Sequence, residues 1–152
     1  MSFAGVRRAG AGDLAAWMAM RTALWPDADD TADALLAQLQ CDDTPVWLGV
    51  CTNGEPVGFA EASLRRDHVN GTASSPVGFL EGLYVTDTWR RSGVGRALVE
   101  AVEQWTRGQG CSELASDALI DNTDSHAAHR AYGFEETERV VCFCKRLPGV
   151  AA

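Results

Sequence analysis

The chain has 152 residues, of which 46% are hydrophobic and 22% are charged, a composition that suits one folded domain and excludes a disordered segment. Its 13 basic and 21 acidic residues give a net charge of −8, which disfavours nucleic acid as a partner because phosphate binding needs clustered Lys and Arg. No apolar run has the length of a membrane span, and five cysteines without metal-type spacing indicate free thiols in a reducing compartment, so we expect a cytoplasmic protein with no membrane partner.

The first half of the chain predicts a strand, two helices and a strand hairpin. Apolar residues recur at helical spacing before Pro26, which ends the first helix, and an acidic stretch then offers N-cap residues for the second. The pair Asn53-Gly54 is a hairpin turn signal. The expected elements cover residues 3–8 (strand), 13–25 and 32–39 (helices), and 45–51 and 56–64 (strands).

The second half predicts a central strand followed by a long amphipathic helix. A polar loop over residues 67–76 leads into this strand. The expected elements cover residues 77–85 (strand), 93–108 (helix), 113–116 (strand), 124–132 (helix) and 137–145 (final strand). No repeat or linker interrupts them, so we expect a single domain over residues 1–152, with a mixed α+β sheet flanked by helices.

The junction between the central strand and the long helix predicts an anion-binding site. The first turn of a helix has backbone N–H groups without an internal partner, and the helix dipole adds positive charge there. Glycines in this turn let a ligand approach the main chain, which suits a pyrophosphate. The alternative is an ordinary strand-to-helix turn with solvated arginines. The residues concerned are Arg90, Arg91, Ser92, Gly93, Val94, Gly95 and Arg96.

This Arg-x-x-Gly-x-Gly pattern between a strand and a helix resembles the acetyl-CoA loop of the GNAT N-acetyltransferase superfamily. The order of elements is similar to the GNAT fold over nearly the whole chain, which implies a mostly antiparallel sheet with splayed central strands. The resemblance implies acetyl-CoA as cosubstrate, with its pantetheine arm along Leu83, Tyr84 and Val85 and a further contact from Asn122. It also suggests that Tyr132 protonates the leaving thiolate, unless this tyrosine only packs at a helix end.

Further blocks along the chain resemble the aminoglycoside 6'-N-acetyltransferases. They are Leu24-Trp25-Pro26, residues 66–71, residues 74–82, Ala115-Ser116-Asp117 and residues 133–140. The resemblance implies acetyl transfer to the 6'-amino group of these antibiotics, resistance as the outcome, and a homodimer. It implies substrate contacts from Trp25, Glu81, Asp117 and Glu138, and His68 stands where the family often has tyrosine, able to stack on a sugar or donate a hydrogen bond.

These residue types suit a polycationic sugar, because carboxylates pair with ammonium groups and an aromatic ring covers the sugar. The acidic net charge also favours a cationic ligand, although solubility alone explains it equally. Glu81 lies in an apolar strand, where an unpaired buried carboxylate would be costly, so a structural role is hard to assign. Structural alternatives remain for the others: a core side chain for Trp25, a turn residue for Asp117 and a solvated acidic face for Glu138.

The expected mechanism is direct attack of the amine on the thioester in a ternary complex. Glu81 is the expected general base, and main-chain N–H groups near residues 83–85 would stabilise the oxyanion. No metal is expected, since His126 and His129 lack a third ligand. The alternatives are a GNAT enzyme for another polyamine or a protein N-terminus, and a non-catalytic acetyl-CoA-binding module.

Overall fold

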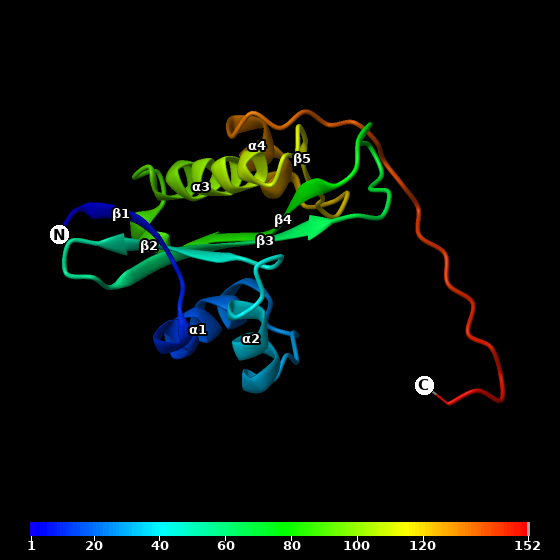
Figure 1. The fold of residues 1–152 in the computed structure, drawn as a ribbon, viewed down its shortest axis with the longest axis horizontal. Coiled ribbons are helices and arrows are strands. Elements are labelled where there is room, and N and C mark those ends of the chain that lie inside the picture. Colours follow the sequence, from blue (N-terminus) through cyan, green and yellow to red (C-terminus); the bar gives the residue numbers. More distant parts are fainter. Residues whose placement is uncertain (152) are drawn as a thin grey trace.

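Five strands form one sheet in the order β1-β2-β3-β4-β5 in the computed structural model, which describes residues 1–151 (Figure 1). The strands are β1 (Phe3–Arg8), β2 (Val46–Cys51), β3 (Pro56–Arg65), β4 (Val77–Val85) and β5 (Leu114–Ser116). The first three pairings are antiparallel and the last is parallel. The expected mixed, mostly antiparallel α+β architecture is therefore confirmed.

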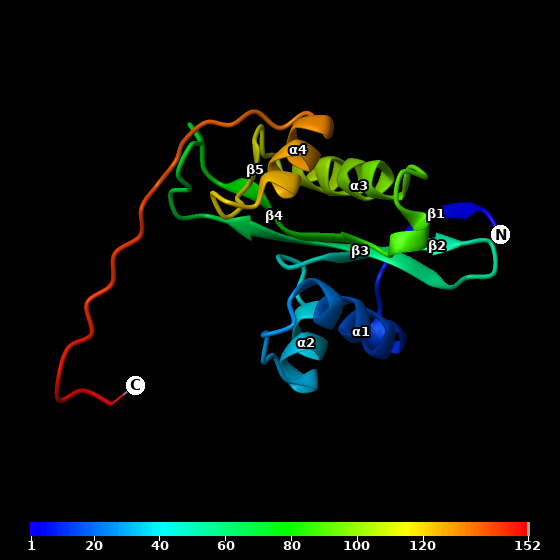
Figure 2. The same ribbon diagram turned by 180° about the vertical axis from the view of Figure 1, so that it is seen from behind.

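Helices cover both faces of this sheet. They are the short η1 (Ala11–Asp13) and η2 (Asp87–Trp89) and the longer α1 (Leu14–Leu24), α2 (Ala32–Leu39), α3 (Val94–Gly108) and α4 (Thr123–Ala131). Figure 1 shows α3 and α4 on one face and α1 and α2 on the other, and the view from behind agrees (Figure 2). Within residues 1–151 we find no helix with the length and apolar character that crossing a bilayer requires.

Two hydrophobic clusters hold the helices to the sheet. On one face, α3 buries Val94, Leu98 and Val102 against the strands. Two glycines, Gly49 in β2 and Gly58 in β3, leave the space that the Val94 side chain fills, because a Cβ at either position would crowd it. The first turn of α3 is thus fixed to the middle of the sheet. The other cluster joins α1 and α2 to β2 and β3.

Strands β4 and β5 part after a short parallel pairing. They pair only from Gly78 with Leu114 to Leu80 with Ser116, where β5 ends. Strand β4 continues to Val85, and its last residues pair only with β3 among the described strands. The expected splay of the central strands is confirmed, and it leaves one edge of the end of β4 open.

A β-bulge interrupts β4 at the point where the strands begin to part. Glu61 of β3 faces Gly82, whereas the next residue, Ala62, faces Leu80, so Glu81 is an extra residue without a partner on β3. A bulge bends the strand and turns the extra side chain to a new direction. The bulge therefore explains how the Glu81 carboxylate projects away from an otherwise apolar strand.

The expected final strand over residues 137–145 is wrong for the isolated chain. After α4 the described chain runs on without helix or strand, and Figure 1 shows it leaving the body as an extended segment. We call residues 137–151 the arm. Its apolar side chains are exposed: Val140, Val141, Phe143, Leu147 and Val150. A strand requires a neighbouring edge for its hydrogen bonds, and the arm meets none within residues 1–151.

Candidate active site

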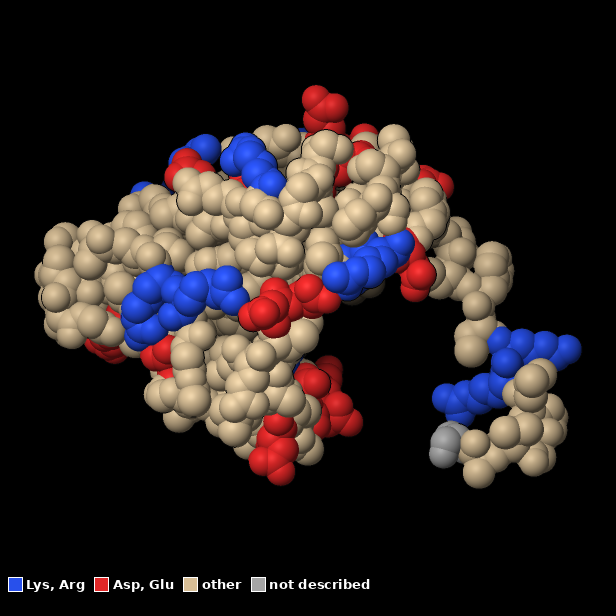
Figure 3. Space-filling model, in the orientation of Figure 1, with Lys and Arg blue, Asp and Glu red and all other residues tan. Residues whose placement is uncertain are grey.

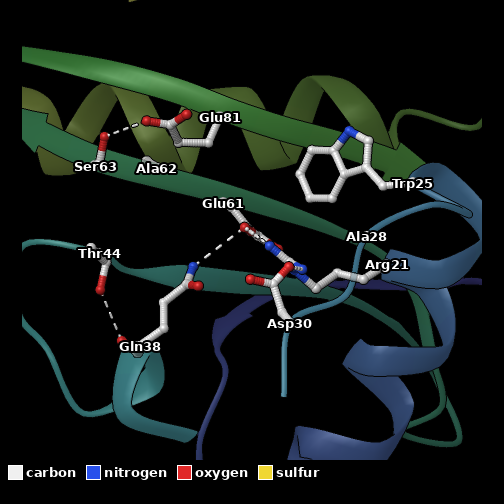
Figure 4. Close-up of a pocket in the computed structure, with 10 residues that line it drawn as sticks. All are labelled: Arg21, Trp25, Ala28, Asp30, Gln38, Thr44, Glu61, Ala62, Ser63 and Glu81. Atoms are coloured by element: carbon white, nitrogen blue, oxygen red, sulfur yellow. Dashed lines mark hydrogen bonds and ion pairs between the residues drawn. The ribbon is translucent and has the colours of Figure 1, made fainter. Parts of the chain in front are cut away.

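A pocket of about 420 Å³ opens where the α1–α2 layer meets β3 and β4 (Figure 4). Its walls come from α1, the α1–α2 connection, α2, the loop before β2, and both strands. The lining residues are Arg21, Trp25, Ala28, Asp30, Gln38, Thr44, Glu61, Ala62, Ser63 and Glu81. Two residues expected in the substrate site, Trp25 and Glu81, thus line one pocket.

The Trp25 indole forms an aromatic wall of this pocket. It follows the C-terminus of α1 and lies over β4 at Gly82, where a Cβ would overlap the ring. Phe59 meets the indole edge-on at 6.3 Å between ring centroids, and the Arg21 guanidinium carbon lies 4.9 Å from the ring centroid. The ring is held on three sides, yet Trp25 is not fully buried and lines the pocket.

The Glu81 carboxylate reaches the pocket from the β4 bulge, and two residues of β3 hold it. Ser63 Oγ donates to Glu81 Oε1 at 2.6 Å. Arg65 Nη2 donates to both carboxylate oxygens, at 2.7 and 3.0 Å, and Arg65 Nε donates to Oε1 at 3.2 Å. Figure 4 shows the Ser63 bond and the separation of Glu81 from the buried carboxylate below. Sequence reasoning missed Ser63 and Arg65.

A second carboxylate, Glu61, lies almost fully buried at 2% exposure beneath the pocket. Trp17 Nε1 donates to its Oε1 at 3.0 Å, Arg21 Nε donates to the same oxygen at 2.5 Å, and Gln38 Nε2 donates to Oε2 at 3.3 Å. Burial acts to lower the pKa of Arg21, but its bonds to Glu61 and Asp30 outweigh that effect and the pKa is raised. This network fixes the floor of the pocket.

The network around Glu61 was not predicted from the sequence, although the sequence contains an indication of it. A glutamate within the apolar strand 56–64 requires a partner, because an unpaired buried charge is costly. Its partners come from α1 and α2, more than 20 positions away along the chain. Only the packing of both helices on β3 identifies them.

The turn in which we expect an anion to bind lies at the start of α3. Gly93 is the N-cap residue with a φ of 89°, in the left-handed region that glycine adopts readily. A Cβ there would meet nothing within 4 Å, so the turn is open to a ligand. Arg90 is held to the preceding segment by Asp87, at 3.0 Å, and by the Val85 carbonyl, at 3.1 Å. Free N–H groups, glycine and nearby arginines fit a phosphate-bearing ligand.

Two further residues are predicted to act on the cosubstrate: Tyr132, which lies near this turn, and Asn122, which lies at the start of α4. The Tyr132 hydroxyl lies against Gly95, where a Cβ would overlap it. Asn122 caps α4, because its side-chain oxygen accepts a bond from Ser125 N at 3.2 Å. That bond uses the amide oxygen and leaves the amide NH₂ free to donate.

Three predicted substrate residues lie outside the pocket lining. His68 is exposed in the loop between β3 and β4, Asp117 is exposed directly after β5, and Glu138 is exposed at the start of the arm. Thr137 packs against Gly71 of the same loop, with Glu138 beside it. The loop and the start of the arm therefore adjoin, but these side chains do not meet Trp25 and Glu81 in this pocket.

The two histidines considered for a metal have other partners. His126 Nε2 lies 2.9 Å from the Leu119 carbonyl, and His129 Nε2 lies 2.8 Å from Ser116 Oγ. In the described part of the chain, no three His, Cys, Asp or Glu side chains are grouped to hold a metal ion.

Acidic side chains gather on the α1–α2 side of the molecule. Figure 3 shows them facing the open space between the α1–α2 layer and the arm. Within the pocket, however, Asp30, Glu61 and Glu81 are each bonded to an arginine. The pocket therefore contains carboxylates that are already paired internally.

The sequence of the chain is similar to those of known acetyltransferases. The acetyltransferase (GNAT) family model matches residues 14–134. An aminoglycoside N(6')-acetyltransferase type 1 from Stenotrophomonas maltophilia is 57% identical over 143 residues, which cover 94% of this chain and 92% of the relative. The enzyme of the same name from Serratia marcescens is 46% identical over 137 residues, covering 89% and 94% of the two chains.

Solved structures give the same result. The crystal structure of aminoglycoside 6'-N-acetyltransferase AAC(6')-Ih from Acinetobacter baumannii superposes with a TM-score of 0.90 at 40% identity, covering 94% of this chain and 98% of that one. AAC(6')-Iy in complex with the bisubstrate analog CoA-S-monomethyl-acetylneamine superposes with a TM-score of 0.85 at 43% identity, covering 93% and 97%.

Proposed function

Because this chain belongs to the acetyltransferase (GNAT) family, we propose that it transfers the acetyl group of acetyl-CoA to the 6'-amino group of aminoglycosides. The observation that carries this proposal is the placement of Trp25 and Glu81 in one pocket, at the point where β4 and β5 part. An aromatic wall and a carboxylate suit an aminosugar. Acetylation removes a positive charge from the antibiotic, and resistance is the proposed consequence.

The two substrates bind together, and the amine attacks the thioester directly. A ligand that joins CoA to an acetylated neamine occupies the related AAC(6')-Iy, which supports adjoining sites for the two substrates. In this chain, the turn over residues 90–96 and Asn122 would hold acetyl-CoA, with residues 83–85 along its pantetheine arm. The open edge of β4 supports that placement.

Each reacting group has a proposed partner in the chain. Glu81 accepts the proton that the ammonium must lose, and main-chain N–H groups of residues 83–85 stabilise the oxyanion. Tyr132, whose hydroxyl lies against Gly95 at the start of α3, protonates the leaving thiolate. His68, Asp117 and Glu138 bind outer parts of the acceptor, and the contact of Thr137 with Gly71 supports a shared location for the loop and the arm.

A matched pair of antibiotics tests the proposed acceptor. Neomycin carries an amine at position 6', whereas paromomycin carries a hydroxyl there and keeps its other amines. We expect thiol release from acetyl-CoA with neomycin and none with paromomycin, and NMR of the product should locate the acetyl group on the 6' nitrogen. Equal release with both antibiotics would contradict the 6' assignment.

The same assay separates the alternatives. Faster release with spermidine or with a peptide bearing a free N-terminus would favour a different GNAT acceptor. Binding of CoA by calorimetry without thiol release for any amine would favour a non-catalytic binding module.

The domain, assembly and location complete the proposal. One continuous sheet supports a single N-acetyltransferase domain over residues 1–152. The arm supports a homodimer, because its exposed Val141 and Phe143 would be covered by a second copy. A cytoplasmic location fits a cosubstrate that is made inside cells.

A further inference from the structure

The two oxygens of the Glu81 carboxylate are bonded unequally. Oε1 accepts three hydrogen bonds, one from Ser63 Oγ at 2.6 Å and two from Arg65 at 2.7 and 3.2 Å. Oε2 accepts only one, from Arg65 Nη2 at 3.0 Å. A carboxylate oxygen has two lone pairs, so Oε1 is saturated while Oε2 can accept another donor.

Arg65 is itself held in place. Its guanidinium carbon lies 3.5 Å from the centroid of the Phe79 ring, and Phe79 is 3% exposed. Stacking on a buried aromatic ring fixes the plane of the guanidinium, so its two nitrogen donors reach Glu81 in a set geometry. Arg65 is the last residue of β3 and pairs with Val77 of β4, so the sheet also fixes its backbone.

We infer that Arg65 is a positioning residue for the acetyl transfer proposed above: with Ser63 it holds Oε1 of Glu81 and leaves Oε2 for the ammonium of the acceptor. The inference rests on the proposed function. Arg65 and Glu81 are 41% and 33% exposed, so solvent screens the repulsion between the guanidinium and an incoming ammonium. The arginine therefore stays in place when the acceptor binds and fixes the direction in which Glu81 takes the proton.

A double-mutant cycle tests whether Arg65 acts through Glu81. We compare Arg65→Gln, Glu81→Gln and the double variant in the neomycin assay. We expect Arg65→Gln to lower kcat about tenfold with an unchanged KM for acetyl-CoA, and the double variant to be no slower than Glu81→Gln alone. If the fold-losses in kcat of the two single variants multiply in the double variant, the inference is overturned. Such a result means that the two free-energy changes add, as they do at independent sites.

The neighbouring arginine provides the matched control. Arg66 pairs with Asp43 at 2.7 Å on the surface and lies outside the pocket lining. Arg66→Gln should keep kcat within about twofold, since exposed ion pairs contribute little. If Arg65→Gln instead keeps kcat and lowers the KM for neomycin, Arg65 competes with the acceptor for Glu81, and the inference is wrong.

Stability and wild-type activity separate the remaining outcomes. Melting temperatures identify any variant that loses activity through unfolding, and Ser63→Ala removes the other Oε1 donor with a smaller change of side chain. A loss of kcat in Ser63→Ala that disappears in the Glu81→Gln background supports the same geometry, and independent loss contradicts it. An inactive wild type would instead contradict the proposed function. An active wild type in which the effects of Arg65→Gln and Glu81→Gln on kcat are independent contradicts only the inference.

Discussion

Glu81 owes its position to the β-bulge of β4, which places a carboxylate beside Trp25 at the start of the splay. If this carboxylate takes the proton of the acceptor, an amide in its place cannot. Glu81→Gln should therefore lower kcat at pH 7 at least tenfold, and the KM for acetyl-CoA should stay unchanged. Glu55→Gln, in the turn between β2 and β3, is the control. Turnover near the wild-type value would remove Glu81 as the base.

Gly82 controls the neighbouring wall of the pocket. A Cβ at this position would overlap the Trp25 ring, so Gly82→Ala should displace the indole. We expect the KM for neomycin to rise about tenfold, which corresponds to about 1.4 kcal/mol of binding free energy. Gly108→Ala in α3, where a Cβ meets nothing within 4 Å, is the control. An unchanged KM in a folded Gly82→Ala protein would show that the indole does not contact the acceptor.

At the scale of elements, the end of β1 is tied to the start of the helical layer. Arg7 donates to both Asp13 oxygens at 2.8 Å, and the Gly10 backbone N–H donates to one of them at 2.8 Å. The hydrogen bonds from Arg7 lower the pKa of Asp13 from 3.8 to about 2. The folded protein therefore keeps this carboxylate charged at pH values where the unfolded chain protonates it.

This contact predicts a pH-dependent contribution to stability. Because the folded-state pKa is lowered, the contribution is complete above about pH 4 and is lost as the pH falls toward 2. Asp13→Asn should lower the free energy of unfolding at pH 7 by about 1 kcal/mol, since solvent reaches Arg7 and screens the pair. Urea unfolding at pH 7, 4 and 3 should show the difference from wild type shrinking below pH 4. A constant difference would contradict the assignment.

The helices and inner strands were predictable from sequence, because apolar spacing and turn residues act locally. Thr31, for example, caps α2 through its hydroxyl, as the acidic stretch before that helix suggested. The bulge at Glu81 was not predictable, since it depends on the register between β3 and β4. The partners of Glu81 and Glu61 depend on the same long-range packing. The sequence therefore pointed to the carboxylate that we propose as the base, but not to the side chains that are bonded to it.

At the scale of the whole molecule, the arm is the main departure from expectation. Its Val140–Cys144 run has the composition of a strand, but a strand forms only against an available edge. Sequence cannot tell whether that edge belongs to the same chain or to another. Within residues 1–151 the arm pairs with no strand, and its apolar side chains stay exposed, which is why we propose a second copy.

Light scattering checks the proposed homodimer. Phe143 is 93% exposed, so Phe143→Asp removes no core contact of the single chain and should leave its fold intact. We expect a dimer for the wild type and a monomer for Phe143→Asp at micromolar concentration. Leu119→Asp, at a residue 75% exposed elsewhere on the surface, should remain dimeric. A wild type that is monomeric under these conditions would contradict the assembly.

The seating of Val94 on Gly49 and Gly58 has a consequence for how this scaffold can change. It fixes the turn that we propose for acetyl-CoA to the centre of the sheet, where a Cβ at either glycine would crowd Val94. The pocket that we propose for the acceptor is lined by α1, α2 and their connection, packed on the opposite face, together with residues of β3 and β4. On the proposed function, we expect substitutions in that helical layer to change which acceptor is preferred while binding of the acyl donor is retained.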